Sequence, residues 1–246
     1  MTRPTHTRFV AAGYGVVNHA LFALAIAAMS AGLYSGLATG LGRLHGPAAW
    51  CANGALAAQF PLLHSFLLSK SGRGWLLRLA PRSIAADLST TVFATLASVQ
   101  VLATFALWSP SGVLLFEARG AWLVLSQVAF GASWLLLVVA LHNAGLELQT
   151  GAIGWWSVLR GQRPSFGDFP THGLFQRCRQ PVYLAFALTL WTGPIRTLDG
   201  LLLALVWTTY CVVAPRHKEA RYLQRYGERF ARYRAQTPYI LPRLRP

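Results

Sequence analysis

Long uninterrupted apolar stretches constrain this chain more than any other feature of its sequence. Four of them lie at residues 9–34, 47–68, 84–108 and 120–142. Each is long enough, at about 1.5 Å of helix per residue, to cross about 30 Å of hydrocarbon. Charged residues make up only 12% of the 246 residues, about half the share that soluble domains carry. The sequence therefore predicts a helical protein that crosses a membrane several times.

Two shorter apolar stretches follow in the last third of the chain. They occupy residues 182–195 and 199–215, and only residues 196–198 separate them, so we expect a tight helical hairpin. Neither stretch is comfortably long enough to span alone, and tilt or local thinning of the bilayer would have to accommodate both. The predicted fold is therefore an all-α membrane bundle of about six transmembrane helices, of which the last two form the hairpin.

Basic residues are distributed unevenly between the two sides of such a bundle. The chain carries 22 Lys and Arg against seven Asp and Glu. Six spans would place nineteen of these basic residues on one side and only Arg43, Arg119 and Arg196 on the other. Because cytoplasmic loops carry the excess of Lys and Arg, both termini are expected in the cytoplasm. The first apolar stretch is too long for a cleaved signal peptide, so we expect it to be retained.

Charge and cysteine patterns argue against two other kinds of protein. No basic segment is interleaved with the aromatic and polar residues of a nucleic-acid surface, so we expect no nucleic-acid partner. The net charge of +15 is better explained by basic loops that face the anionic lipids of the bilayer. The three cysteines, Cys51, Cys178 and Cys211, lack C-x-x-C spacing, which argues against a disulfide framework and against a zinc site.

Two segments on the predicted cytoplasmic side are not spans. Residues 149–178 carry Trp155, Trp156 and Phe166 among Gly, Pro and Arg, which predicts a loop at the level of the lipid headgroups. Residues 216–236 predict a basic amphipathic helix. Its two neighbouring stripes are aromatic (Tyr222, Tyr226, Phe230, Tyr233) and basic (Arg221, Arg225, Arg229, Arg232).

Polar residues from four segments are predicted at one depth near the cytoplasmic face. His64 lies near the end of the second apolar stretch, His142 closes the fourth, Pro181 opens the hairpin, and Glu219 follows it. Ionisable groups at membrane depth are costly, so their shared depth predicts a site there. His19, near the middle of the first stretch, is instead expected to make a hydrogen bond between helices.

Known catalytic patterns are absent from the sequence. We find no Ser-His-Asp order, paired carboxylates, phosphate-cradling glycine loop or metal-ligand spacing. A soluble Rossmann methyltransferase is excluded because no G-x-G-x-x-G follows a strand. The remaining prediction is a polar pocket accessible to lipid, suited to bringing a charged cofactor together with an apolar substrate.

The segment RCRQPVYLAF, residues 177–186, carries a family resemblance. It resembles the integral-membrane methyltransferases of the isoprenylcysteine carboxyl methyltransferase and phospholipid methyltransferase superfamily. Their signature is R-H-P-x-Y-x-G before a short helical hairpin, then a Glu-Glu pair, a Tyr-Gly, a tyrosine-rich helix and a terminal Ile/Leu-Pro. The match covers about residues 169–243. The residues that fit are Arg179, Pro181, Tyr183, Glu219, Tyr226, Gly227, Tyr233, Ile240, Leu241 and Pro242.

The resemblance implies a fold, a cofactor and a set of site residues. It divides the chain into an N-terminal four-helix transmembrane region, residues 1–148, and a methyltransferase-like region, residues 149–246. It implies that S-adenosylmethionine is held between the hairpin and the C-terminal segment. In this reading Arg179 pairs with an acidic group such as the cofactor carboxylate, Tyr183 lines the pocket, and Glu219 binds amino or hydroxyl groups. Gln180 and Tyr226 complete the implied cofactor site.

The substrate side of the implied site is less defined. The sequences around His64 and His142 look most like those of bacterial methanethiol S-methyltransferases, which makes these two histidines the candidate substrate residues. This likeness also implies a bacterial inner membrane and a small thiol or lipophilic methyl acceptor.

Three positions depart from the family pattern. Gln180 stands where the motif has histidine, Ala185 where it has glycine, and Lys218 where it has the first acid of the pair. Glutamine can donate and accept a hydrogen bond, but it cannot titrate. Two alternatives to a methyltransferase therefore stay open. One is a haem protein similar to NnrU and zeta-carotene isomerase, with His64 and His142 as axial ligands; the other is a catalytically silent accessory subunit.

Overall fold

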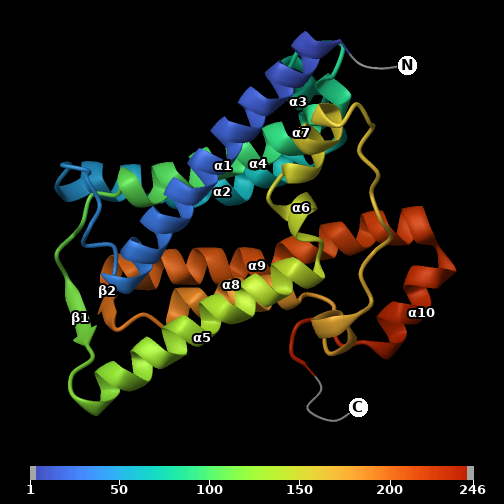
Figure 1. The fold of residues 1–246 in the computed structure, drawn as a ribbon. Helices are drawn as coiled ribbons and strands as arrows, with labels where there is room; N and C mark the ends of the chain where they lie inside the picture. The colour runs from blue at the N-terminus through green and yellow to red at the C-terminus, as the bar shows by residue number, and fades with distance from the viewer. Residues whose placement is uncertain (1–3, 243–246) are drawn as a thin grey trace. The chain divides into compact units, whose positions relative to one another are not determined.

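The computed structural model describes residues 4–242 of the chain, and this part is predominantly helical (Figure 1). The predicted all-α class is confirmed, since the only strands in the described chain are two short ones. In chain order the elements are α1 (Thr5–Tyr34), α2 (Gly46–Leu67), α3 (Lys70–Arg78), α4 (Ala85–Ala106), β1 (Leu114–Glu117), α5 (Ala121–Asn143), α6 (Leu146–Gln149), α7 (Ala152–Leu159), the 3-10 helix η1 (Gly173–Gln176), α8 (Pro181–Trp191), β2 (Ile195–Thr197), α9 (Leu198–Tyr226) and α10 (Glu228–Gln236).

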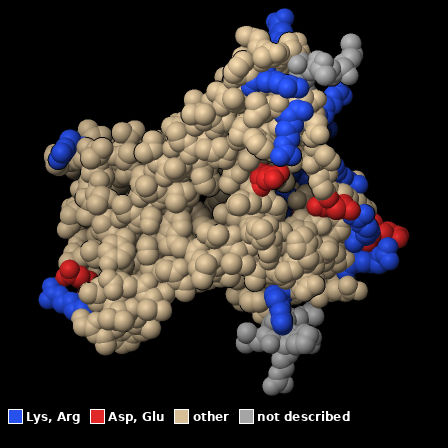
Figure 2. All heavy atoms as spheres, in the orientation of Figure 1, with Lys and Arg blue, Asp and Glu red and all other residues tan. Residues whose placement is uncertain are grey.

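The apolar stretches all contain helices, but they do not all meet the requirements of a span. Within residues 4–242, four helices are long and apolar enough to cross a bilayer, namely α1, α4, α5 and α9. The helix on the second predicted span, α2, has 22 residues but is not among the helices with the hydropathy of a span, while α8 has only 11 residues. Uncharged residues cover most of the face shown in Figure 2, and Lys, Arg, Asp and Glu side chains appear on it only in small groups. The protein is therefore an integral-membrane helical protein.

The described residues form two compact units that are not continuous in sequence. The first comprises residues 4–32, 37–111 and 146–167, and the second comprises residues 33–36, 112–145 and 168–242. The domain boundary predicted after residue 148 rests on the resemblance of the C-terminal region to a known family, and it stays a prediction.

The first unit is built around α4, which packs against α2, α3 and α7. Leu88 of α4 and Val158 of α7 are completely buried in its core. Close approach of α7 requires glycine at position 154, because a Cβ there would lie 2.5 Å from the Thr91 hydroxyl oxygen. This helix corrects the prediction of a loop over residues 149–178. The predicted interhelical bond of His19 is confirmed, since the Trp155 indole nitrogen donates to its Nε2 atom at 3.2 Å.

The second unit consists of α5, α8 and α9 with α10 and the two strands. Helix α8 packs between α5 and α9, and Phe186 stacks on Trp207 with 5.8 Å between ring centroids. The predicted hairpin is thus present, although its connection is longer than predicted. The connection includes β2, which pairs antiparallel with β1. Ala185, at the motif glycine position, is completely buried in a cluster with Leu137 and Ala140 of α5.

The C-terminal amphipathic segment is two helices rather than the predicted one. Helix α9 continues to Tyr226, and α10 begins at Glu228. Gly227 between them has φ 55° and ψ −132°, a conformation that residues with a side chain rarely adopt. The aromatic and basic stripes continue across this break, which is why their spacing alone suggested a single helix.

Candidate functional site

The residues at three motif positions form a hydrogen-bonded group in the second unit, which we call the Glu219 cluster (Arg179, Gln180 and Glu219). Arg179 precedes α8, Gln180 occupies the N-cap position of this helix without a side-chain capping bond, and Glu219 lies on α9. The Arg179 Nε and Nη2 atoms donate to the two carboxylate oxygens of Glu219 at 2.8 and 3.2 Å. Gln180 Nε2 donates to Glu219 Oε1 at 2.7 Å. The carboxylate is therefore bound in a fork by one cation and one amide.

Arg179 also holds the end of the C-terminal region. Its Nη1 atom donates to the Arg234 carbonyl at 2.8 Å and to the carbonyl of Thr237. Its backbone N–H donates to the Pro238 carbonyl at 2.9 Å, and its guanidinium lies 5.5 Å from the Tyr239 ring centroid. Each guanidinium nitrogen thus has an acceptor within the chain. The acidic partner of Arg179 in the structure is Glu219, and the implied pairing with a cofactor carboxylate stays a prediction.

Two polar groups, one within the cluster and one beside it, have hydrogen-bonding capacity left. The Gln180 side chain is 1% exposed, and its Oε1 atom has no hydrogen-bond partner among the described residues. The Lys218 ammonium, on the same helix as Glu219, lies 5.3 Å from the Tyr183 ring centroid and 5.9 Å from that of Tyr222. A buried acceptor and an ammonium that lies near two aromatic rings could receive the opposite charges of an amino acid group.

Tyr226 lies in an aromatic group that the sequence did not reveal in full. Its ring packs on Phe169 at 4.9 Å and on Tyr222 at 5.6 Å between centroids. Phe169 is 6% exposed and also contacts Phe230 of α10 at 5.4 Å. Phe169 therefore packs the loop before the motif against both α9 and α10, the helices on either side of Gly227. The contacts that the structure gives Tyr226 are with these rings. Its implied role in cofactor binding stays a prediction.

The loop that carries Phe169 is also fixed by polar contacts. Asp168 makes an ion pair with Arg229 of α10, and the hydrogen bond from this guanidinium lowers the pKa of the Asp168 carboxyl. Tyr233 donates its hydroxyl to the Phe175 carbonyl at 2.7 Å, and burial raises the pKa of that hydroxyl. These contacts position the motif from its N-terminal side.

The two candidate substrate histidines belong to different units. His142 is exposed at the end of α5 in the second unit. The neighbouring Asn143 side chain accepts a hydrogen bond from the Leu174 N–H at 2.9 Å and so holds η1. His64 is in the first unit, where its ring lies 4.9 Å from that of Phe60 and 4.7 Å from that of Phe93. Among residues 4–242, no three His, Cys, Asp or Glu side chains are grouped so as to hold a metal ion.

Sequence reasoning missed three residues that shape this site, namely Phe169, Asn143 and Tyr222. Asn143 and Phe169 carried no motif signal, because their partners are backbone groups and rings distant in sequence. Tyr222 was recognised only as part of an aromatic stripe. Its position one helical turn after Lys218 was the signal that could have placed it near the motif.

The fold and the cluster define a class: an integral-membrane helical protein with a polar site at the base of a short hairpin. Comparison with known proteins narrows this class. The chain is 28% identical to the methanethiol S-methyltransferase of Pseudomonas deceptionensis over 81% of its length and 75% of the relative. It is 29% identical to methanethiol S-methyltransferase 2 of Bradyrhizobium diazoefficiens over 77% of its length and 71% of the relative. The enzyme of that name from Mycobacterium tuberculosis is 26% identical over 77% of both chains.

These similarities confirm the resemblance that the terminal motif carried. The likeness is to methanethiol S-methyltransferases, within the isoprenylcysteine carboxyl methyltransferase-like superfamily, and it extends well beyond residues 169–243. No protein-family profile matches the chain, and no solved structure does. The names of the relatives support a methyltransferase.

Proposed function

We propose that this protein transfers a methyl group from S-adenosylmethionine to a small thiol at the cytoplasmic face of a bacterial inner membrane. The observation that most supports this function is similarity to several methanethiol S-methyltransferases over roughly four fifths of the chain. A small thiol is one member of the wider class of lipophilic methyl acceptors, which enter the hydrocarbon region of the bilayer readily.

The residues at the Glu219 cluster fit the proposed cofactor. The unpaired Gln180 Oε1 atom is an acceptor for an ammonium or hydroxyl group. The Lys218 ammonium has donors for a carboxylate. Tyr183 lies at the start of α8, and aromatic faces attract a cationic group such as a sulfonium. When bound, S-adenosylmethionine would supply an activated methyl group on sulfur.

The chain itself would contribute mainly positioning. Methyl transfer is an in-line displacement, whose barrier falls when the two reacting atoms are held close and aligned. Arg179 fixes the start of α8 to Glu219 of α9 and to carbonyls at the end of α10. A ligand bound beside these three helices would therefore contact side chains whose helices are held together by Arg179. Thiols react as thiolates, so the site must also favour loss of the thiol proton.

Calorimetry with S-adenosylhomocysteine tests this proposal on the purified protein in nanodiscs. We expect binding with a Kd between the low micromolar and the millimolar range, and formation of a thioether when S-adenosylmethionine and methanethiol are both added. Gln180→Met, which keeps the length of the side chain and removes its amide, should weaken binding at least fivefold. Absence of both binding and thioether formation by the unaltered protein would exclude the proposal.

Reversing the departures from the motif distinguishes an enzyme with a specialised site from a protein whose site has lost its function. The double substitution Gln180→His with Lys218→Glu restores the family pattern. If the site is specialised, as we propose, this variant loses thiol methylation. If the site has decayed into that of a silent subunit, the same variant gains cofactor binding that the unaltered protein lacks.

A further inference from the structure

Lys218 is the residue at which the chain departs most from the family pattern, because a positive charge replaces an acid. Its ammonium contacts the rings of Tyr183, from α8, and Tyr222, one turn further along α9. Among the described residues it makes no ion pair and no hydrogen bond to nitrogen or oxygen. Ring faces attract an ammonium, but they leave its three N–H donors without a lone-pair acceptor of normal strength.

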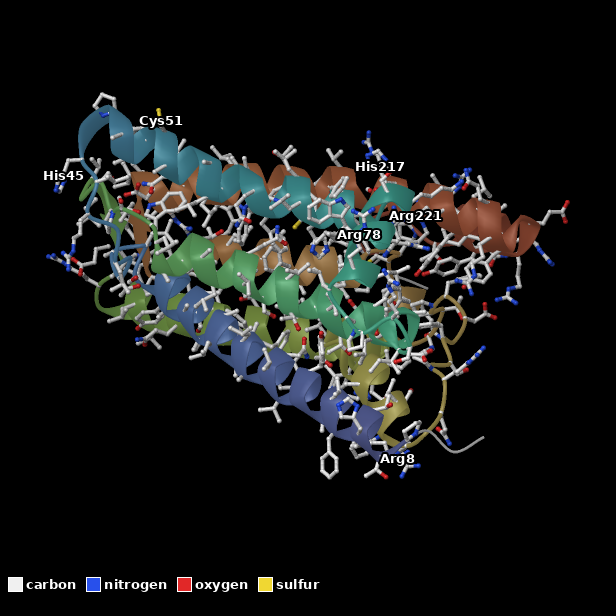
Figure 3. The ribbon with its side chains drawn as sticks, turned by 90° about the horizontal axis from the view of Figure 1, so that it is seen from above. Arg8, His45, Cys51, Arg78, His217 and Arg221 are labelled. Atoms are coloured by element: carbon white, nitrogen blue, oxygen red, sulfur yellow. The ribbon has the colours of Figure 1, made fainter. Side chains whose placement is uncertain are left out.

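The charge of Lys218 is compensated only in part by its neighbours, since Glu219 attracts it and Arg221 repels it. Glu219 is adjacent in sequence, but both of its oxygens bind Arg179 and one also binds Gln180. Arg179 therefore neutralises Glu219, and Lys218 remains as an additional positive charge. Arg221 follows on the same helix and adds to it (Figure 3). A partly buried site with this excess favours an anionic ligand.

We propose that Lys218 binds an anionic group of the bound ligands, either the carboxylate of the cofactor or the thiolate of the methyl acceptor. This inference rests on the proposed function and adds a specific residue to it. Both groups share the chemistry that the ammonium requires, a compact negative charge with lone pairs. An acid at this position would repel both of them, so the charge reversal changes which ligand group is held here.

Binding of the thiolate would give Lys218 a direct part in the reaction. The thiol loses its proton to solvent water on binding, and the ammonium stabilises the resulting negative sulfur. The lone pair of this sulfur forms the new bond to the methyl carbon as the bond from that carbon to the cofactor sulfur breaks. The products are a neutral thioether and neutral-sulfur S-adenosylhomocysteine, and no further reactant is required.

Calorimetry on Lys218→Met, which keeps the apolar contacts of the side chain, separates the two anions. Two probes are used: S-adenosylhomocysteine, which has the carboxylate, and methylthioadenosine, which lacks the whole amino acid group. If Lys218 binds the carboxylate, the variant loses at least tenfold in affinity for the first probe and less than twofold for the second. If it binds the thiolate, both affinities change less than twofold, while KM for methanethiol rises at least tenfold and the pH profile of kcat/KM shifts upward.

The chain offers a matched control, because its only other lysine is Lys70 at the exposed start of α3. Lys70→Met should change none of these quantities, and Lys218→Arg, which keeps the charge, should recover most of the loss. An amine-reactive label read by mass spectrometry adds a measurement independent of turnover. Labelling of Lys218 should fall when S-adenosylhomocysteine or the thiol is added, whereas labelling of Lys70 should not.

The outcomes separate failure of this inference from failure of the proposed function. If the unaltered protein binds S-adenosylhomocysteine and methylates the thiol, but Lys218→Met does both equally well and keeps its pH profile, Lys218 does not bind an anion. If the unaltered protein binds no cofactor and methylates no thiol, the proposed function itself is wrong. A Lys218→Met protein that does not fold lacks the thermal unfolding transition of the unaltered protein. In that case Lys218→Arg and the labelling experiment decide whether Lys218 binds an anion.

Discussion

At the scale of single residues, the motif arginine is first a structural residue. The Arg179 and Glu219 side chains are 11% and 9% exposed, so each charge depends on the other for compensation. Removing one partner of a buried pair leaves an unpaired charge and costs about 3–5 kcal/mol, whereas removing both costs much less than the sum. This coupling, rather than a direct contact with substrate, is what the structure assigns to Arg179.

A double-mutant cycle measures this coupling. We expect Arg179→Met and Glu219→Gln each to lower the free energy of unfolding in detergent by about 3 kcal/mol. The double variant should be less destabilised than the sum of the two by at least about 1 kcal/mol. Additive losses would mean that the pair contributes no interaction of its own. The exposed pair of Arg119 with Glu117 is the control, and its cycle should give a coupling within about 0.5 kcal/mol of zero.

At the scale of elements, most helices could be predicted from the sequence and their interruptions could not. Long apolar stretches predict helices because a single segment can satisfy its own backbone groups inside a bilayer only as a helix. The break at Gly227 and the short helix α7 depend instead on tertiary contacts, namely the Phe169 packing and the close fit of Gly154 on Thr91. The motif likewise identified Arg179 and Glu219, but their mutual bond comes from the folding of the hairpin against the C-terminal helices.

The break at Gly227 yields a prediction with a matched control. A Cβ at Gly227 would meet no atom within 4 Å, but its φ is +55°. Gly131 in the interior of α5 has equal space without a positive φ. Gly227→Ala should therefore lower the free energy of unfolding by about 1–3 kcal/mol through backbone strain alone. Gly131→Ala should be neutral or stabilising by up to about 1 kcal/mol. Equal effects in chemical denaturation would show that the turn tolerates a side chain.

The Asp168 loop yields a prediction about pH. The bond from Arg229 lowers the pKa of Asp168 in the folded protein, so its stabilising effect is complete above the unfolded value of about 4. It is lost as pH falls through the folded value. Hydrogen exchange of residues 168–176, corrected for the intrinsic rate, should lose protection in this acid range. Asp168→Asn should show the low protection at every pH, whereas Glu117→Gln should leave the segment unchanged. Protection of residues 168–176 that does not change with pH would contradict this role of Asp168.

At the scale of the whole molecule, the distribution of charge and the position of the site must agree. The Glu219 cluster draws residues from the start of α8 and the last part of α9, next to the basic C-terminal segment. A charged cofactor that is present only in the cytoplasm can reach this cluster only if it faces that compartment. The function that we propose therefore requires the orientation that the basic residues predict.

Cysteine labelling in a bacterial membrane tests this orientation. We begin from a Cys51→Ser background, because Cys51 is exposed, while Cys178 and Cys211 are buried and burial raises the pKa of the Cys178 thiol, which slows its reaction. Arg73→Cys and Arg225→Cys should react with an impermeant maleimide only in inverted vesicles. Arg119→Cys, whose parent side chain is 83% exposed, should react only in right-side-out vesicles. Reaction of residues 73 and 225 from opposite sides would exclude the even number of crossings that six spans place between them. Reaction of Arg225→Cys only in right-side-out vesicles would exclude a cytoplasmic cofactor site, because Glu219 precedes this residue on the same helix.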